Sequence, residues 1–111
     1  MYAQYWKNGQ LIFRESIHSY VSSIFIYRND VYVAGYLSTA YPGADIACYW
    51  KNGQRVNLTD GNIGSIATSI FVTDTNVDVS GDVNFQAVYW KDGVVIPVAL
   101  MLGDQEPMPF L

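Results

Sequence analysis

The chain has 111 residues and a formal net charge of −4 at pH 7; 50% of its residues are hydrophobic, 15% are aromatic and only 14% are charged. This composition provides enough apolar side chains for one packed core and excludes an intrinsically disordered chain. The negative balance argues against a nucleic-acid partner, because phosphate backbones attract basic surfaces.

The first stretch that predicts structure is Tyr5-Trp6-Lys7-Asn8-Gly9, and it recurs at 49–53 and, with Asp for Asn, at 89–93. Asn-Gly and Asp-Gly favour two-residue type I′ turns, which need a positive φ at both central residues. Alternating apolar runs flank each turn, so each copy predicts a β-hairpin with Ala and Tyr on one face and Trp on the other. The structural residues of this repeat are Trp6, Gly9, Trp50, Gly53, Trp90 and Gly93.

A second motif alternates with the first and predicts a second kind of hairpin. It runs from Ser23 to Gly35 and again from Ser69 to Gly81, which is the same distance in both copies (35 − 23 = 12 and 81 − 69 = 12). Each copy has two apolar runs around a polar turn, at 27–30 or 73–76. Strands of constant length with connections of variable length are typical of a repeated scaffold.

Two hairpins give four strands in each repeat of roughly 40–45 residues. We therefore expect one all-β domain over 1–111, with half a unit at 3–13, full units at 23–58 and 69–98, and a tail at 99–111. Pro97 falls in the last strand and cannot donate a ladder hydrogen bond, so that strand should be an edge strand or carry a bulge.

With these motifs the chain resembles the β-propeller repeats of uncharacterised, mostly bacterial proteins, in which Ser-Ile-Phe-Val and Val-Tyr-Val-Ala-Gly strands alternate with a Tyr-Trp-Lys-Asn-Gly hairpin. The resemblance extends from residue 3 to about residue 98. It implies antiparallel four-stranded blades, about two and a half of them here, whereas propellers close with about 4–8. The chain would then be a piece of a longer repeat protein, or copies of it would associate. We expect self-association through the open blade faces, because an uncovered apolar face is an association site.

Aromatic residues supply the candidate binding site. Tyr20, Tyr36 and Tyr41 lie in or beside the variable connections, and tyrosine rings with a polar tip can stack on sugars. The three tryptophans recur at one position of the repeat, which favours core packing over ligand binding.

The acidic run Asp74, Asn76 and Asp78 begins like a calcium-binding loop, but Val79 stands where an EF-hand loop has glycine. We interpret the run as a solvent-facing edge of the second full unit and keep a metal site as the weaker alternative. No arrangement typical of a nucleophilic triad or of a pair of catalytic carboxyl groups stands out, so no catalytic residue and no cofactor are predicted.

These features favour a non-catalytic binding or scaffolding module with a protein or carbohydrate ligand, presented by connections such as Leu37–Asp45. The alternatives are a fragment of a propeller-type hydrolase or lyase and a purely structural repeat. The N-terminus shows no signal peptide, and the longest apolar run, 94–102, is too short to span a bilayer. The compartment is not indicated; secretion or the cell envelope, as part of a longer protein, is the alternative.

Overall fold

The computed structural model describes residues 1–39 and 43–98, and this part of the chain is all-β, with 64% of it in strands. The strands are β1 (Gln4–Lys7), β2 (Gln10–Arg14), β3 (Ser19–Tyr27), β4 (Asp30–Leu37), β5 (Ile46–Lys51), β6 (Gln54–Asn57), β7 (Ser65–Val72), β8 (Val77–Val83), β9 (Gln86–Lys91) and β10 (Val94–Pro97). They form three antiparallel sheets, in the orders β1-β2, β3-β4-β5-β6 and β10-β9-β8-β7. The all-β expectation is confirmed, and the described sheets are open.

Each predicted Asn-Gly or Asp-Gly turn joins two paired strands. Asn8, Asn52 and Asp92 have φ values of 51°, 50° and 51°, and the glycines after them have values of 77°, 86° and 85° (Gly9, Gly53 and Gly93). These are the two consecutive positive φ values that a type I′ turn requires, in residues that reach that region at low cost.

The strands that open the second motif begin earlier than expected. The sequence pattern placed their starts at Ser23 and Ser69, but β3 begins at Ser19 and β7 at Ser65. In both strands the register shifts by one residue just before the expected start, which is a β-bulge. The bulge interrupts the alternation of side chains and hides the first part of each strand from a pattern search.

The glycine that ends the second motif faces this bulge. A Cβ atom on Gly35 would lie 1.9 Å from the carbonyl oxygen of Tyr20, and one on Gly81 would lie 2.0 Å from that of Ile66. No larger residue fits while the bulged strand lies so close. The recurring Ser-to-Gly spacing therefore encodes a bulge and its partner.

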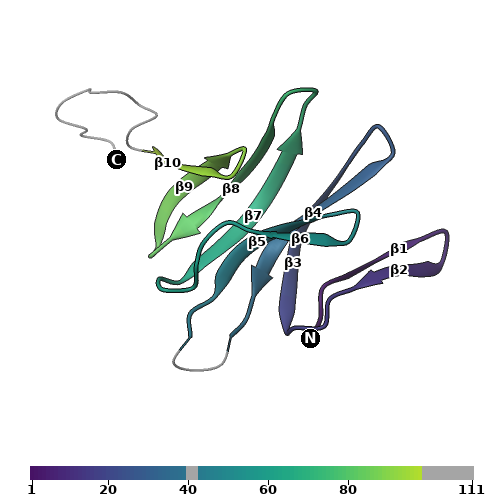
Figure 1. Ribbon diagram of the computed structural model, residues 1–111, viewed down its shortest axis with the longest axis horizontal. Coiled ribbons are helices and arrows are strands. Elements are labelled where there is room, and N and C mark those ends of the chain that lie inside the picture. Colours follow the sequence, from purple (N-terminus) through teal and green to yellow (C-terminus); the bar gives the residue numbers. More distant parts are fainter. Residues whose placement is uncertain (40–42, 99–111) are drawn as a thin grey trace.

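The three sheets lie side by side along the molecule, with sheet β3–β6 between the other two (Figure 1). One core lies between hairpin β1–β2 and sheet β3–β6 and contains Ala3, Val33, Leu37, Cys48 and Trp50. The other lies between the two four-stranded sheets; its members include Tyr32, Ala34, Ala47, Ile70, Val79 and Trp90. Both faces of sheet β3–β6 thus pack against a neighbouring sheet, one of them only in part, which explains why large apolar residues point from it in both directions.

The three recurring tryptophans do not share one environment. Trp50 and Trp90 are 0% and 1% exposed, as core packing requires, but Trp6 is 58% exposed. The expectation of core packing is therefore wrong for Trp6. Trp50 and Trp90 each pack against the sheet that comes before their own in the chain, whereas none of the described strands precedes β1.

Pro97 lies in β10, which is an edge strand of its sheet, opposite Val88 of β9. Its missing N–H therefore removes no bond from the interior of the ladder, as expected. The predicted tail at 99–111 lies outside the described residues, and the division of the chain into half and full units stays a prediction.

Candidate functional site

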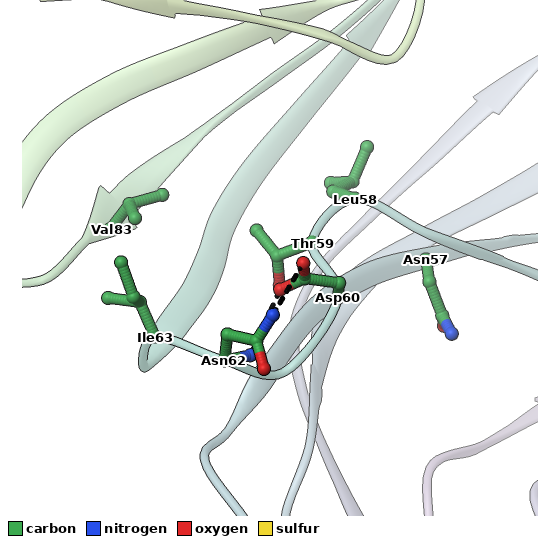
Figure 2. Close-up of a pocket in the computed structure, with 7 residues that line it drawn as sticks. All are labelled: Asn57, Leu58, Thr59, Asp60, Asn62, Ile63 and Val83. Carbon is green, nitrogen blue, oxygen red and sulfur yellow. Dashed lines mark hydrogen bonds between the residues drawn. The ribbon is translucent and has the colours of Figure 1, made fainter.

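The connection between β6 and β7 lies at the end of the molecule opposite the β3–β4 and β7–β8 turns (Figure 1). Two hollows flank this connection. The first has a volume of about 550 Å³ and is shown in Figure 2. Its lining residues are Asn57, Leu58, Thr59, Asp60, Asn62, Ile63 and Val83.

The polar groups of the first hollow are bonded within the connection itself. The backbone N–H of Asn62 donates to Asp60 Oδ1 at 3.0 Å, and the Asn62 side-chain amide donates to Asp60 Oδ2 at 2.9 Å (Figure 2). Thr59 Oγ1 lies 2.7 Å from Ser65 Oγ. These hydrogen bonds stabilise the conformation of the loop and leave few free polar groups for a ligand. No aromatic ring lines this hollow, so it is the weaker candidate for a binding site.

The second hollow lies between the two four-stranded sheets and has a volume of about 420 Å³. We call it the Tyr36 pocket. It gathers side chains from β4, the segment before β5, the start of β7, the end of β8 and the β8–β9 turn. Its lining residues are Tyr36, Asp45, Gly64, Ser65, Ile66, Asp82, Asn84 and Phe85.

Of the three predicted binding tyrosines, Tyr36 lines this pocket and Tyr20 packs against Tyr36. The rings of Tyr20 and Tyr36 are stacked, with centroids 5.0 Å apart and planes 25° apart. Both residues lie in paired strands (β3 and β4) and not in loops, so their backbones are held by the sheet. Tyr41 lies outside the described residues.

The phenol of Tyr36 keeps its proton more firmly than an ordinary tyrosine. Burial, then the negative charge of Asp45 and the neighbouring Tyr20, raise the pKa of Tyr36. At neutral pH its hydroxyl can therefore both donate and accept a hydrogen bond.

Phe85 is the most unusual side chain of the pocket. It is 97% exposed and has a φ of 63°, directly after Asn84 with a φ of 53°. The β8–β9 turn thus has two consecutive positive φ values, with phenylalanine where the three other such turns named above have glycine. A left-handed conformation costs a non-glycine residue about 1–2 kcal/mol. Strained residues of this kind concentrate at functional sites.

Sequence reasoning missed Phe85. One signal was present in the sequence. The segment from Gly81 to Trp90 is shorter than the equivalent segment from Gly35 to Trp50, so its two strands must be joined by a tight turn, and no glycine lies between Gly81 and Trp90.

The pocket carries negative charge. Asp45 and Asp82 both line it, and its lining contains no lysine or arginine. Ser65, at its floor, is 2% exposed, and its Oγ accepts a hydrogen bond of 2.9 Å from the backbone N–H of Ala47. Such a lining suits a ligand rich in hydroxyl groups, whose O–H groups donate to the carboxylates, and repels an anionic ligand.

The residues of the weaker metal alternative lie at the other end of the molecule, where Asp74 and Asn76 belong to the β7–β8 turn and Asp78 to β8. Asp74 forms an ion pair with Arg28 at 2.9 Å and accepts a hydrogen bond from the hydroxyl of Tyr27. Within residues 1–39 and 43–98, no three His, Cys, Asp or Glu side chains come together as a metal site would require.

The comparisons with known proteins add no family. No family model, no curated protein and no solved structure matches the chain. In the part of the chain that the structure describes, no helix is long and apolar enough to cross a membrane. The function is therefore inferred from the geometry of the chain alone.

Proposed function

We propose that this chain is a non-catalytic carbohydrate-binding module built from β-propeller-type repeats, with the Tyr36 pocket as its ligand site. The architecture supports the repeat type: two antiparallel four-stranded sheets of matching strand order and bulge position pack face to face. This is how neighbouring propeller blades are arranged.

The observation that carries the binding proposal is Phe85. A phenylalanine that is almost fully exposed contributes nothing to the core, and its positive φ makes the turn less stable than glycine would. Since this side chain lies at the pocket, ligand binding is the simplest function that would offset the free-energy cost of its left-handed conformation.

The pocket chemistry fits a neutral sugar. Aromatic faces such as those of Phe85 and Tyr36 pack on the apolar face of a sugar ring, and the polar tip of a tyrosine can bond its hydroxyls. The carboxylates of Asp45 and Asp82 add acceptors for further hydroxyl groups. The volume of about 420 Å³ lies within the range of small-ligand sites.

A second candidate is glycoside hydrolysis, because two carboxyl groups line one pocket and such enzymes use a pair of them. No arginine or histidine lines the pocket beside these two carboxyl groups. We therefore favour binding without turnover. Incubating the chain with the best-bound glycan separates the two candidates, since hydrolysis releases a new reducing end.

The test is a panel of neutral glycans screened against the wild-type chain and the variant Phe85→Gly. We expect Phe85→Gly to lose at least tenfold in affinity for the glycan that binds best. The same variant should raise the free energy of unfolding by about 1 kcal/mol, because glycine relieves the left-handed strain. Loss of binding with a gain in stability distinguishes a binding role from a structural one.

Asn29→Gly is the matched control, because Asn29 has a φ of 70° in the β3–β4 turn, at the other end of the molecule. This variant should leave glycan binding unchanged. The proposal fails if no glycan binds, or if Phe85→Gly binds as tightly as the wild-type chain.

A further inference from the structure

Each buried tryptophan packs in the same way against the unit that precedes it. Trp50 shares its core with Ala3 and Tyr5, from the β1 strand of the preceding hairpin. Trp90 shares its core with Ala47 and Tyr49, from β5 of the preceding sheet. The chain thus repeats one contact twice: a tryptophan against an Ala-x-Tyr strand.

Both ends of the molecule carry an unused half of this contact. At one end Trp6 is 58% exposed. At the other end, β9 carries the third Ala-x-Tyr pair, Ala87 and Tyr89. Ala87 is exposed, whereas the equivalent Ala3 and Ala47 are 2% and 0% exposed. The two leftover halves complement each other: Ala87 is exposed, and Trp6 is more than half exposed, although it borders a hollow with Ile24 and Ile26 of the same chain.

We propose that copies of this chain associate head to tail, with Trp6 of one copy packed against Ala87 and Tyr89 of the next. The interface continues the two already present within the chain, since it sets the same residue types against one another. It is independent of the sugar-binding proposal, because none of its residues lines the Tyr36 pocket.

The extent of the surfaces supports a second copy as the occupant. A two-stranded hairpin covers only half of a four-stranded sheet: beneath β1–β2, Trp50 of β5 is buried, while Ile24 and Ile26 of β3 are 53% and 66% exposed. Hairpin β1–β2 of a second copy would likewise cover β9 and leave the outer face of β7 and β8 in water.

On β8, that outer face is more polar than the matching face of β4. In sheet β3–β6, the side chains of β4 that face sheet β7–β10 are Tyr32, Ala34 and Tyr36. Two of the matching positions of β8 carry Asp78 and Ser80, and the third carries Asp82, which lines the Tyr36 pocket. The apolar residues of this face are Phe71 of β7, opposite Asp78, Ile96 of β10, opposite Tyr89, and the pair Ala87 and Tyr89, where the hairpin of a second copy would lie. The carboxylate of Asp78 and the hydroxyl of Ser80 would disfavour burial of this face under a second four-stranded sheet.

A head-to-tail contact is heterologous, so it generates either a closed ring or an open filament. A symmetric dimer through two Trp6 faces would instead leave Ala87 and Tyr89 uncovered. The two arrangements respond differently to mutations at the two ends, and this difference is the basis of the test.

The experiment is sedimentation velocity of the full 111-residue chain and of the single variants Trp6→Arg and Ala87→Arg. Both residues are exposed, so each variant should fold, which circular dichroism checks. We expect the wild-type chain to be oligomeric at tens of micromolar and each variant to be monomeric. An equimolar mixture of the two variants should form a one-to-one dimer and grow no further, since it holds one intact tryptophan end and one intact Ala-x-Tyr end.

Ile63→Arg is the matched control, because Ile63 is 51% exposed in the β6–β7 connection, away from both ends. This variant should associate like the wild-type chain. A monomeric wild-type chain, an oligomeric Ala87→Arg variant, or two folded variants whose mixture stays monomeric would each overturn the proposal.

Discussion

The two buried tryptophans occupy the same position in the repeat but differ in how their indole N–H groups are satisfied. Trp50 Nε1 donates to Glu15 Oε1 at 2.9 Å, and Arg55 Nη1 donates to the same oxygen at 2.8 Å. Trp90 Nε1 is buried and has no hydrogen-bond partner among residues 1–39 and 43–98. One contact between sheets is therefore polar and the other is apolar with an orphaned donor.

Two substitutions between the repeats account for the difference. Leu58 occupies the place of Glu15, since their backbone N–H groups donate at 2.8 Å to the carbonyls of Ala47 and Ala3 respectively. Val95 lies opposite Trp90 as Arg55 lies opposite Trp50. The repeat thus specifies where the ring packs, and residues on the neighbouring strands decide what bonds its N–H. The first contact gains geometric specificity from its carboxylate; the second depends on burial alone.

The largest expected effect comes from truncating a buried ring. Trp90→Ala should lower the free energy of unfolding by about 3–5 kcal/mol, because it removes a large side chain from the core. Trp6→Ala should change it by less than about 0.5 kcal/mol at a concentration where the chain is monomeric. Denaturant titration followed by circular dichroism measures both. Equal losses at the two positions would mean that Trp6 is buried in solution.

Making the first contact resemble the second should have an intermediate effect. Glu15→Leu leaves the Trp50 N–H and the Arg55 guanidinium without their acceptor, so stability should fall by about 1–3 kcal/mol. Glu15→Leu combined with Arg55→Val should recover part of that loss, because the Arg55 charge no longer lacks its carboxylate, while the Trp50 N–H stays unpaired as the Trp90 N–H is. A double variant as unstable as Glu15→Leu would show that the unpaired Arg55 guanidinium does not contribute to the loss.

The smallest effect should appear as a pH dependence that only the first contact has. Burial raises the pKa of Glu15, but hydrogen bonds from Trp50 and Arg55, the charge of Arg55 and the Ser16 N–H together bring it below the ordinary value of 4.5. A lowered pKa in the folded state adds stability above the ordinary value, and this contribution is lost as pH falls through the folded-state pKa. Denaturation midpoints measured from pH 6 downward should therefore fall less steeply in the Glu15→Leu, Arg55→Val double variant than in the wild-type chain. Parallel curves would contradict this assignment.

Local sequence signals predicted most of the strands and turns. The Asn-Gly and Asp-Gly turns, the two hairpins of the second motif and the edge position of Pro97 all follow from the φ preferences and hydrogen-bonding capacity of single residues. The starts of β3 and β7 were missed because a bulge breaks the alternation on which strand recognition depends.

The candidate site was only partly within reach. Tyr20 and Tyr36 were selected for their chemistry, but the sequence could not indicate that their rings stack or that Asp45 and Asp82 line the same pocket. Those contacts join residues from different strands and from different sheets. Phe85 was missed because its interest comes from a positive φ and full exposure, which depend on the fold.

By itself the sequence determined an antiparallel all-β chain of repeated hairpins, because turn geometry and side-chain alternation act over a few neighbouring residues. Only the tertiary structure decided that Trp50 and Trp90 are buried and Trp6 is exposed, because the burial of each ring depends on whether a preceding sheet covers it. The exposed Trp6, the orphaned Trp90 N–H and the Tyr36 pocket all arise between sheets, where residues distant in the chain meet.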